Sequence, residues 1–248
     1  MKKTIFVVLI TLAFKIGAGQ DRIPSWFKSL PQQVNSATLS VGMTGSYSDR
    51  HLARKVAIHK ARKTMAKQIR IRLIFEVQEM SDGFYRLFQP TFEQIYYENI
   101  LAYVDTSSIV VDSAFIDNRY YVLLSLFPLH ERINSSVVNW GARPKWIEKL
   151  PDKDGYIYGI GMVANYSLWK NGWNDADEFA RFDACKNMKI NTAAIRTKKH
   201  TDQYTDERKI LRQSVDIAVA NSVIIERWYD REQDIFYSLC RIPYEGKK

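Results

Sequence analysis

Apolar residues over positions 53–69 recur every three or four positions, which is the period of an amphipathic helix. The row consists of Ala53, Ala57, Ile58, Ala61, Met65 and Ile69. Ser48 or Asp49 is expected to cap this helix, because a short side-chain oxygen can accept hydrogen bonds from the first backbone amides. Residues 70–78 alternate instead, with an apolar residue at every odd position. This alternation predicts a half-buried strand directly after the helix.

The remaining pattern predicts the same kinds of element twice. Strands are predicted at residues 38–43, 108–116 and 120–127, and again at 156–162, 223–228 and 235–242; second helices are predicted at about 91–104 and 206–220. A turn at Asp117-Asn118 joins two of these strands. The order β-α-β-α-β-β, with helices on one face of a mostly antiparallel sheet, predicts an α+β fold built from two-layer units.

The two halves of this pattern also match in sequence. Residues 24–31 match 144–151, 41–43 match 160–162, 46–48 match 165–167, 115–117 match 228–230 and 121–128 match 236–243, while the row Ala53, Ala57, Ala61 and Met65 matches Ala176, Ala180, Ala184 and Met188. Collinear matches of this kind indicate an internal repeat. We therefore predict two tandem units at residues 24–132 and 144–244, joined by a linker around 133–143. The alternative is a single domain with accidental similarity.

These features resemble the LPP-twenty lipoprotein family of bacterial envelope proteins. Its members share a starting Pro-x-Trp, a strand that ends in glycine, a helix with alanine at every fourth position and a final strand that ends in Ile-Pro or Leu-Pro. The matching residues are Pro24, Trp26, Gly42, Phe127 and Pro128 in the first unit and Pro144, Trp146, Gly161, Ile242 and Pro243 in the second. The same unit is similar to the N-terminal domain of a flagellar ring-assembly protein. The resemblance implies an envelope protein of undefined function. The family's lipid-attachment cysteine is missing here.

Residues 1–19 have the layout of a secretory signal peptide: a basic start, about ten apolar residues and small residues before the expected cleavage after Gly19 or Gln20. A retained anchor is the alternative, supported by Lys15 within the apolar run. Cleavage would remove three lysines and no acid, which lowers the formal net charge from +9 to +6. We expect an exported, soluble protein in the periplasm or at the outer-membrane periphery of a Gram-negative type bacterium, where nucleic acid is not an expected partner.

Cys185 and Cys240 are the only cysteines. An oxidising compartment permits a disulfide between them. The repeat, however, aligns Cys185 with Arg62 on the solvent side of a helix and Cys240 with Ser125 in a sheet strand. That arrangement argues against a bond between the two cysteines.

No catalytic residue, metal site or cofactor is predicted. The segment from Gly159 to Ala164 fits the dinucleotide pattern G-x-G-x-x-A. Its equivalent in the first unit lacks the first glycine and continues for several residues before a helix can start, and no acid ends a convincing second parallel strand in the second unit. A strand-to-loop turn that needs positive φ is the preferred interpretation. The four histidines do not pair at metal-ligand spacing, and two lone cysteines do not make a zinc site.

An acidic cluster opens the long helix of the second unit. Its members are Asp175, Asp177, Glu178 and Asp183. Carboxylates at a helix start interact favourably with the helix dipole, so we interpret the cluster as capping rather than catalytic.

The most suggestive chemical feature is basic. Residues 50–72 contain nine lysines and arginines and no acid. On a helical wheel, six cations gather opposite the alanine row: Lys55, Lys60, Arg62, Lys63, Lys67 and Arg70. They either form an ordinary solvated helix face or a contact site for anionic lipid, lipopolysaccharide phosphate or an acidic partner.

Together these features predict a non-enzymatic envelope protein that acts as a binding or scaffold module. Its partner is expected to be an envelope protein or an anionic envelope component. The alternatives are a carrier of small ligands or anionic lipid that uses the groove between the two units, and an enzyme that acts on envelope polymers.

Overall fold

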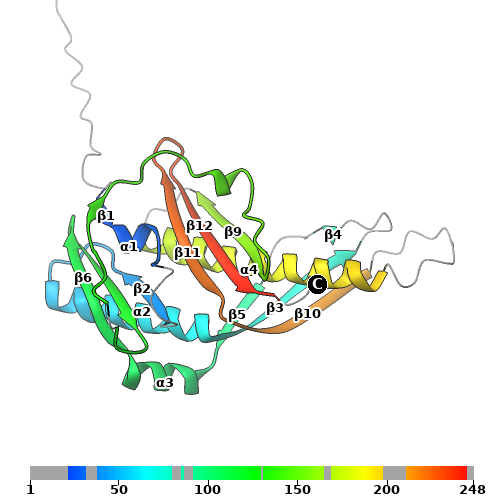
Figure 1. The fold of residues 1–248 in the computed structure, drawn as a ribbon, viewed down its shortest axis with the longest axis horizontal. Coiled ribbons are helices and arrows are strands. Elements are labelled where there is room, and N and C mark those ends of the chain that lie inside the picture. Colours follow the sequence, from blue (N-terminus) through cyan, green and yellow to red (C-terminus); the bar gives the residue numbers. More distant parts are fainter. Residues whose placement is uncertain are drawn as a thin grey trace, which may run out of the picture.

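The computed structural model describes residues 22–31, 38–79, 85–86, 92–129, 131–164, 169–197 and 211–244. The elements are shown in Figure 1. In chain order they are β1 (Ile23–Pro24), α1 (Ser25–Lys28), β2 (Leu39–Met43), α2 (Arg50–Ile69), β3 (Arg70–Glu79), β4 (Tyr85–Arg86), β5 (Phe92–Tyr96), α3 (Glu98–Ser107), β6 (Ile109–Ile116), β7 (Arg119–Ser125), β8 (Val137–Val138), a 3₁₀ turn (Lys145–Ile147), β9 (Tyr156–Ala164), α4 (Trp169–Thr197), β10 (Leu211–Ala220), β11 (Val223–Asp230) and β12 (Ile235–Pro243).

Two three-stranded antiparallel sheets form the body of the protein. Strands β2, β7 and β6 are neighbours in the first sheet, and strands β9, β12 and β11 are neighbours in the second. Helix α2 packs on β2 and β7, and helix α4 packs on β9 and β12. The predicted α+β class is confirmed by this arrangement.

A third sheet joins the two halves of the chain. Strand β3, directly after α2, pairs antiparallel with β10 from the Arg70–Ala220 pair to the Glu79–Leu211 pair, and β4 and β5 also pair with β3. In Figure 1 this long ribbon extends beside α4. Each half therefore contributes one strand to a shared ladder of backbone hydrogen bonds.

The two predicted second helices need correction. Residues 211–220 form strand β10, so the helix predicted at 206–220 is wrong in the part that the structure describes. Val215, Ile217 and Val219 alternate with smaller or polar residues, which is a strand pattern, and the partner strand β3 satisfies the backbone. In the first half, residues 92–96 form strand β5, and the helix begins only at Glu98.

Elsewhere the structure agrees with the helix cap and the turn that the sequence predicts. The side chain of Asp49 accepts hydrogen bonds from the backbone amides of His51 and Leu52, which confirms the predicted cap of α2. Asp117 and Asn118 have φ values of 50° and 58° and join β6 to β7 in the predicted turn. These two residue types tolerate the left-handed conformation that a tight two-residue hairpin requires.

Gly42 on β2 and Gly161 on β9 let the two helices lie directly on their sheets. A β-carbon at Gly42 would overlap the backbone oxygen of Ala57, and one at Gly161 would overlap that of Ala176 in the same way. The contacts thus relate Ala57 to Ala176, whereas the sequence comparison paired Ala57 with Ala180. The two assignments differ by one helical turn.

The segment that fits the dinucleotide pattern lies inside strand β9. Every residue from Gly159 to Ala164 pairs with a residue of β12. Neither Gly159 nor Gly161 has positive φ, so the predicted strand-to-loop turn is wrong. These glycines permit the close approach of α4, and no loop of free amides is present at this point to hold a phosphate.

The two sheets share one hydrophobic core. Its centre is Phe27 of α1, whose ring packs edge-on against Tyr121 of β7, Trp140 of the linker and Trp173 of α4. The predicted units therefore pack against each other through buried aromatic side chains.

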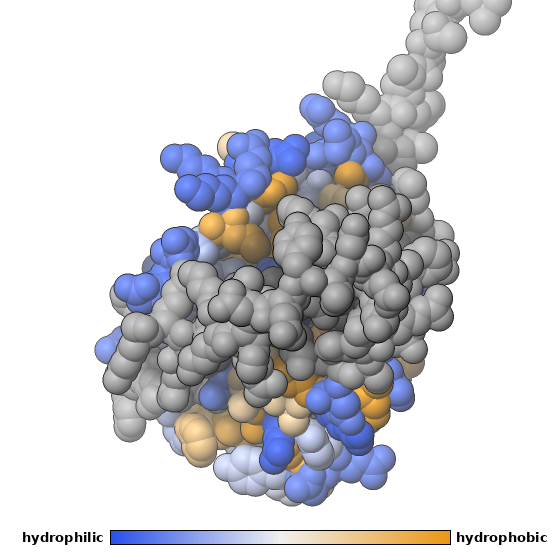
Figure 2. Space-filling model, turned by 90° about the vertical axis from the view of Figure 1, so that its right-hand side faces the viewer, coloured by the Kyte–Doolittle hydropathy of each residue, from blue (hydrophilic) through white to orange (hydrophobic). Residues whose placement is uncertain are grey.

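Figure 2 views the end from which β3, β4 and β10 project, where mostly hydrophilic residues surround smaller hydrophobic areas on the coloured surface.

Candidate functional site

The six basic residues singled out from the sequence all lie on or at the end of α2, but they do not form one continuous surface. Arg62 points back to its own half of the chain, where its Nη1 lies 3.7 Å from Oδ1 of Asp105 and its Nε donates to Oγ of Ser108. The guanidinium of Arg70 lies 5.0 Å from the centre of the Tyr97 ring. Both cations therefore make contacts within the first unit.

Three of the six face α4 instead. Lys67 forms an ion pair with Glu178, with 2.5 Å between Nζ and Oε1, and so connects α2 to α4. Burial lowers the pKa of Lys67 below its ordinary value, and the nearby Glu178 carboxylate opposes that shift. Lys63 lies 5.9 Å from the centre of the Tyr96 ring, and Lys60 is half-buried next to it. Lys55 is exposed.

Lys60, Lys63 and Lys67 line a groove of about 380 Å³ between α2 and α4. The opposite wall comes from α4 and includes Glu178 and Arg181. We call this the inter-helix groove. Since each wall belongs to a different half of the chain, the site exists only because the two halves dock together.

Asp177 of α4 is the second acid of the groove, and both oxygens of its carboxylate accept hydrogen bonds. Asp177 accepts hydrogen bonds from Nε and Nη2 of Arg227 at 3.0 and 2.7 Å and from Oγ of Ser238 at 2.6 Å. Arg227 also donates to the backbone oxygen of Phe27, and its guanidinium lies 4.9 Å from the centre of that ring. This buried pair ties α4, β11 and β12 to α1.

Arg181 is the unusual residue of the groove. It is 2% exposed, and Nη1 makes one long hydrogen bond of 3.4 Å to the backbone oxygen of Asp177. Nε and Nη2 are buried and have no hydrogen-bond partner within the part of the chain that the structure describes. Buried guanidinium groups are ordinarily paired. The sequence analysis missed this residue, because Arg181 follows Asp177 and Glu178 by one helical turn and so looks like part of an ordinary charged, solvated helix face.

The acidic cluster does not cap its helix. Helix α4 begins at Trp169, so the first of these acids, Asp175, lies more than one turn inside it. Asp177 and Glu178 form the ion pairs described above, and Asp183 accepts from the backbone amide of Ile160 and from Lys186. The capping interpretation was wrong because the helix extends further towards the N-terminus than the acids suggest.

The cysteines are also placed differently than expected. Cys185 and Cys240 are both fully buried, their thiols are free, and they pack in the same apolar cluster. When the offset between Ala57 and Ala176 is applied to Cys185, its counterpart in the first half is Ala66, which is buried, and not Arg62. Burial raises the pKa of both thiols, that of Cys240 to about 12. The prediction that Cys185 faces solvent was therefore wrong, because this residue lies in the core.

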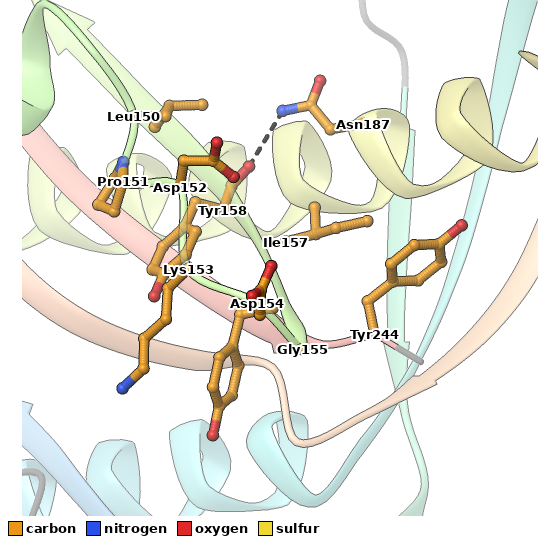
Figure 3. Close-up of a pocket in the computed structure, with 11 residues that line it drawn as sticks. Leu150, Pro151, Asp152, Lys153, Asp154, Gly155, Ile157, Tyr158, Asn187 and Tyr244 are labelled. Atoms are coloured by element: carbon orange, nitrogen blue, oxygen red, sulfur yellow. Dashed lines mark hydrogen bonds between the residues drawn. The ribbon is translucent and has the colours of Figure 1, made fainter. Parts of the chain in front are cut away.

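A second hollow of about 250 Å³ lies beside the start of β9 (Figure 3). Asn187 of α4 donates to the backbone oxygen of Tyr158 at 3.0 Å, and Tyr244 lies across the hollow from Leu150 and Pro151 in Figure 3. None of the residues around this hollow has a buried side-chain nitrogen or oxygen that lacks a partner among the described residues. It therefore offers less to a polar ligand than the inter-helix groove.

Two further features are absent from the described residues. No group of three or more His, Cys, Asp or Glu side chains is placed to hold a metal ion there. No helix in that part of the chain is long and apolar enough to cross a membrane.

Comparison of the chain with protein-family models, with curated proteins and with solved structures gives no match. The similarity to LPP-twenty proteins thus stays a prediction from the sequence.

Proposed function

We propose that this protein is a non-enzymatic, exported binding module of the bacterial cell envelope, and that the face of α2 around the inter-helix groove contacts an anionic envelope component. The observation that carries the proposal is the charge of this helix. Residues 50–72 contain no acid, Lys55 is exposed, and Lys60 and Lys63 stand at the edge of the groove. Clustered lysines next to a surface attract anionic headgroups by about 1 kcal/mol each.

Tandem duplication of an LPP-twenty-like unit is part of the proposal. It is supported by two contacts that occur once in each half. Gly42 and Gly161 receive the helices in the same way. Trp26 donates to Asp112 and Trp146 donates to Glu226, both through the indole nitrogen.

Vesicle sedimentation tests the proposed contact. Purified protein is mixed with vesicles of phosphatidylcholine alone or with added phosphatidylglycerol. We expect binding only to the anionic vesicles, weakened by salt because exposed charges are screened. Replacing Lys55, Lys60 and Lys63 together by Glu should reduce this binding by about a hundredfold or more, since three attractive charges become repulsive.

A matched control is available around the start of the second unit. Arg143, Lys145 and Lys149 are exposed, and their replacement by Glu changes the net charge by the same amount. This variant should bind the anionic vesicles almost as well as the wild type. Equal losses in both variants would show a response to net charge alone and would contradict a specific contact through α2.

An acidic protein partner would be found by a different measurement. Crosslinking in intact cells, followed by identification of the co-purified molecules, should recover an envelope component with the wild type and lose it with the α2 triple variant. Recovery of the same component with both variants would contradict a role of this helix.

A small-ligand carrier is the second candidate function. It is favoured by the volume of the inter-helix groove and by its mixed lining of cations and the Tyr96 ring. This candidate predicts saturable binding of a soluble anion with no vesicles present.

A further inference from the structure

The guanidinium of Arg181 is held in the protein interior without an anionic partner among the residues that the structure describes. It is 2% exposed, and no carboxylate oxygen of the described chain lies within ion-pair distance of it. A buried charge with unsatisfied donors destabilises a fold unless something compensates it. A purely structural helix face would be better served by Leu or Met at this position, so the residue calls for a functional explanation.

The acids of the groove cannot supply that compensation. Asp177 receives both donors of the Arg227 fork together with the hydroxyl of Ser238. Glu178 is paired with Lys67. Each of these carboxylates is matched by its own cation, and the charge of Arg181 remains in excess.

The guanidinium of Arg181 is best suited to bind an oxyanion. The Nε and Nη2 groups of a guanidinium form a planar edge with two parallel N–H donors, which matches two oxygens of one phosphate or carboxylate. Lys60 and Lys63 lie at the same groove and add positive charge beside Arg181. A phosphate, with up to two negative charges and three free oxygens, can serve several of these cations at once, whereas a carboxylate carries a single charge.

We propose that the inter-helix groove binds a single phosphate group and that Arg181 is its anchor. On binding, the phosphate replaces the Glu178 carboxylate as the partner of Lys67, so that Arg181 and Lys67 hold it from both walls. The inference rests on the proposed function and specifies the ligand class of the same site. The phosphate can belong to a soluble molecule or to a lipid headgroup, since both present the same oxygens.

Titration calorimetry of the purified protein with inorganic phosphate at low ionic strength tests the soluble source. We expect saturable binding by the wild type and a loss of at least about tenfold in Arg181→Met, because a charge-assisted bidentate contact is removed. Glu178→Gln should bind more tightly, because the competing carboxylate is neutralised. Lys149→Gln, an exposed cation away from the groove, is the matched control and should bind as the wild type does.

Vesicles of phosphatidylcholine with and without phosphatidic acid test the lipid source. Binding that requires both phosphatidic acid and Arg181 assigns the ligand to a headgroup, and binding of inorganic phosphate alone assigns it to a soluble molecule. If neither probe depends on Arg181, the proposal is overturned. Acetate that binds as tightly as phosphate would also overturn it.

Folding is checked by thermal unfolding of each variant. We expect Arg181→Met to unfold at the same temperature as the wild type or higher, because an unsatisfied buried charge is removed. Should it unfold at a lower temperature, Arg181→Lys keeps the charge and removes the planar fork, and phosphate binding about tenfold weaker than that of the wild type would still support the anchor role. Unchanged binding by Arg181→Lys would contradict that role.

The outcome separates this inference from the proposed function. Binding to phosphatidylglycerol vesicles that needs Lys55, Lys60 and Lys63 but not Arg181 would leave the envelope contact intact and refute the phosphate anchor. Phosphate binding that needs Arg181, in a protein with no affinity for anionic vesicles, would do the reverse.

Discussion

The indole nitrogen of Trp26 lies 2.8 Å from Oδ2 of Asp112 and donates a hydrogen bond to it. Asp112 is the first residue after a β-bulge in strand β6. The second half of the chain repeats this relationship, because Trp146 donates to Glu226, which is the first residue after a β-bulge in β11. A bulge turns a side chain out of its regular alternation, and in both strands it presents a carboxylate to a tryptophan.

Replacing Trp26 by Phe should therefore destabilise the protein by about 1–3 kcal/mol, since the apolar ring is largely retained while Oδ2 of the half-buried Asp112 carboxylate loses the indole donor. Trp146→Phe should have a similar cost. Urea unfolding gives both values. A cost at only one of the two tryptophans would contradict their equivalence.

Gly161→Ala is expected to be more damaging than its single added methyl group suggests. The new β-carbon would overlap backbone atoms of Ala176 and Ala180, which cannot move aside without shifting α4. Overpacking of this kind costs about 1–3 kcal/mol or more. At Gly155, which has φ of 78° and open space around it, Asn tolerates the same backbone. Gly155→Asn should be nearly neutral in the same unfolding experiment.

The fold could be predicted where its causes are local. Asp49 caps α2 through its own neighbours, and the Asp117-Asn118 turn needs only two residues that accept positive φ. Strand β10 was missed because its stability comes from β3, which lies far away along the sequence. Its alternation of Val215, Ile217 and Val219 was visible, but the expected repeat of the first half outweighed it.

The site was predicted in part, for the same physical reason. The basic character of α2 is a property of one segment and can be read directly. Which cations remain available depends on Asp105, Glu178 and the aromatic rings that meet them in the folded state. Arg181 was overlooked because charge on a helix normally indicates solvent, and only the packing of α4 shows that this side chain is buried.

The Arg227–Asp177 pair gives a test of how α4 is held. Both side chains are buried, and two parallel hydrogen bonds of 3.0 and 2.7 Å join them. Asp177→Leu or Arg227→Leu should each cost about 3–5 kcal/mol, because each leaves an uncompensated charge in the interior. The double variant should cost much less than the sum, and a double-mutant cycle by chemical denaturation measures the difference. Simple additivity would contradict direct coupling of the two residues.

Lys67 should make stability depend on pH in the alkaline range. Its pKa is lowered on folding, mainly by burial, so the folded protein releases this proton at a lower pH than the unfolded chain does. Between the folded pKa and the ordinary value of 10.5, the unfolded state binds more protons. The contribution of Lys67 to the free energy of unfolding therefore rises with pH in that interval.

Lys67→Met removes this contribution while other alkaline titrations remain. The difference in free energy of unfolding between wild type and Lys67→Met, measured at a series of pH values, should shift in favour of the wild type as the pH approaches 10.5. A difference that is independent of pH, or one that shifts in favour of the variant, would contradict the assignment.

The two thiols should behave as core groups in the folded protein. Burial raises the pKa of Cys185 and Cys240, and the thiolate is the reactive form. A thiol reagent at neutral pH should therefore modify neither residue in the native state and both in urea, and non-reducing mass spectrometry should find the mass of two free thiols. A mass lower by two hydrogens would show a disulfide instead.

The two thiols should also make stability depend on pH. In the unfolded chain they ionise near their ordinary pKa of 9.0, whereas in the folded protein they stay neutral to higher pH. Their contribution to the free energy of unfolding is therefore complete below pH 9.0 and falls above it. Replacing both residues by Ala should remove this alkaline loss.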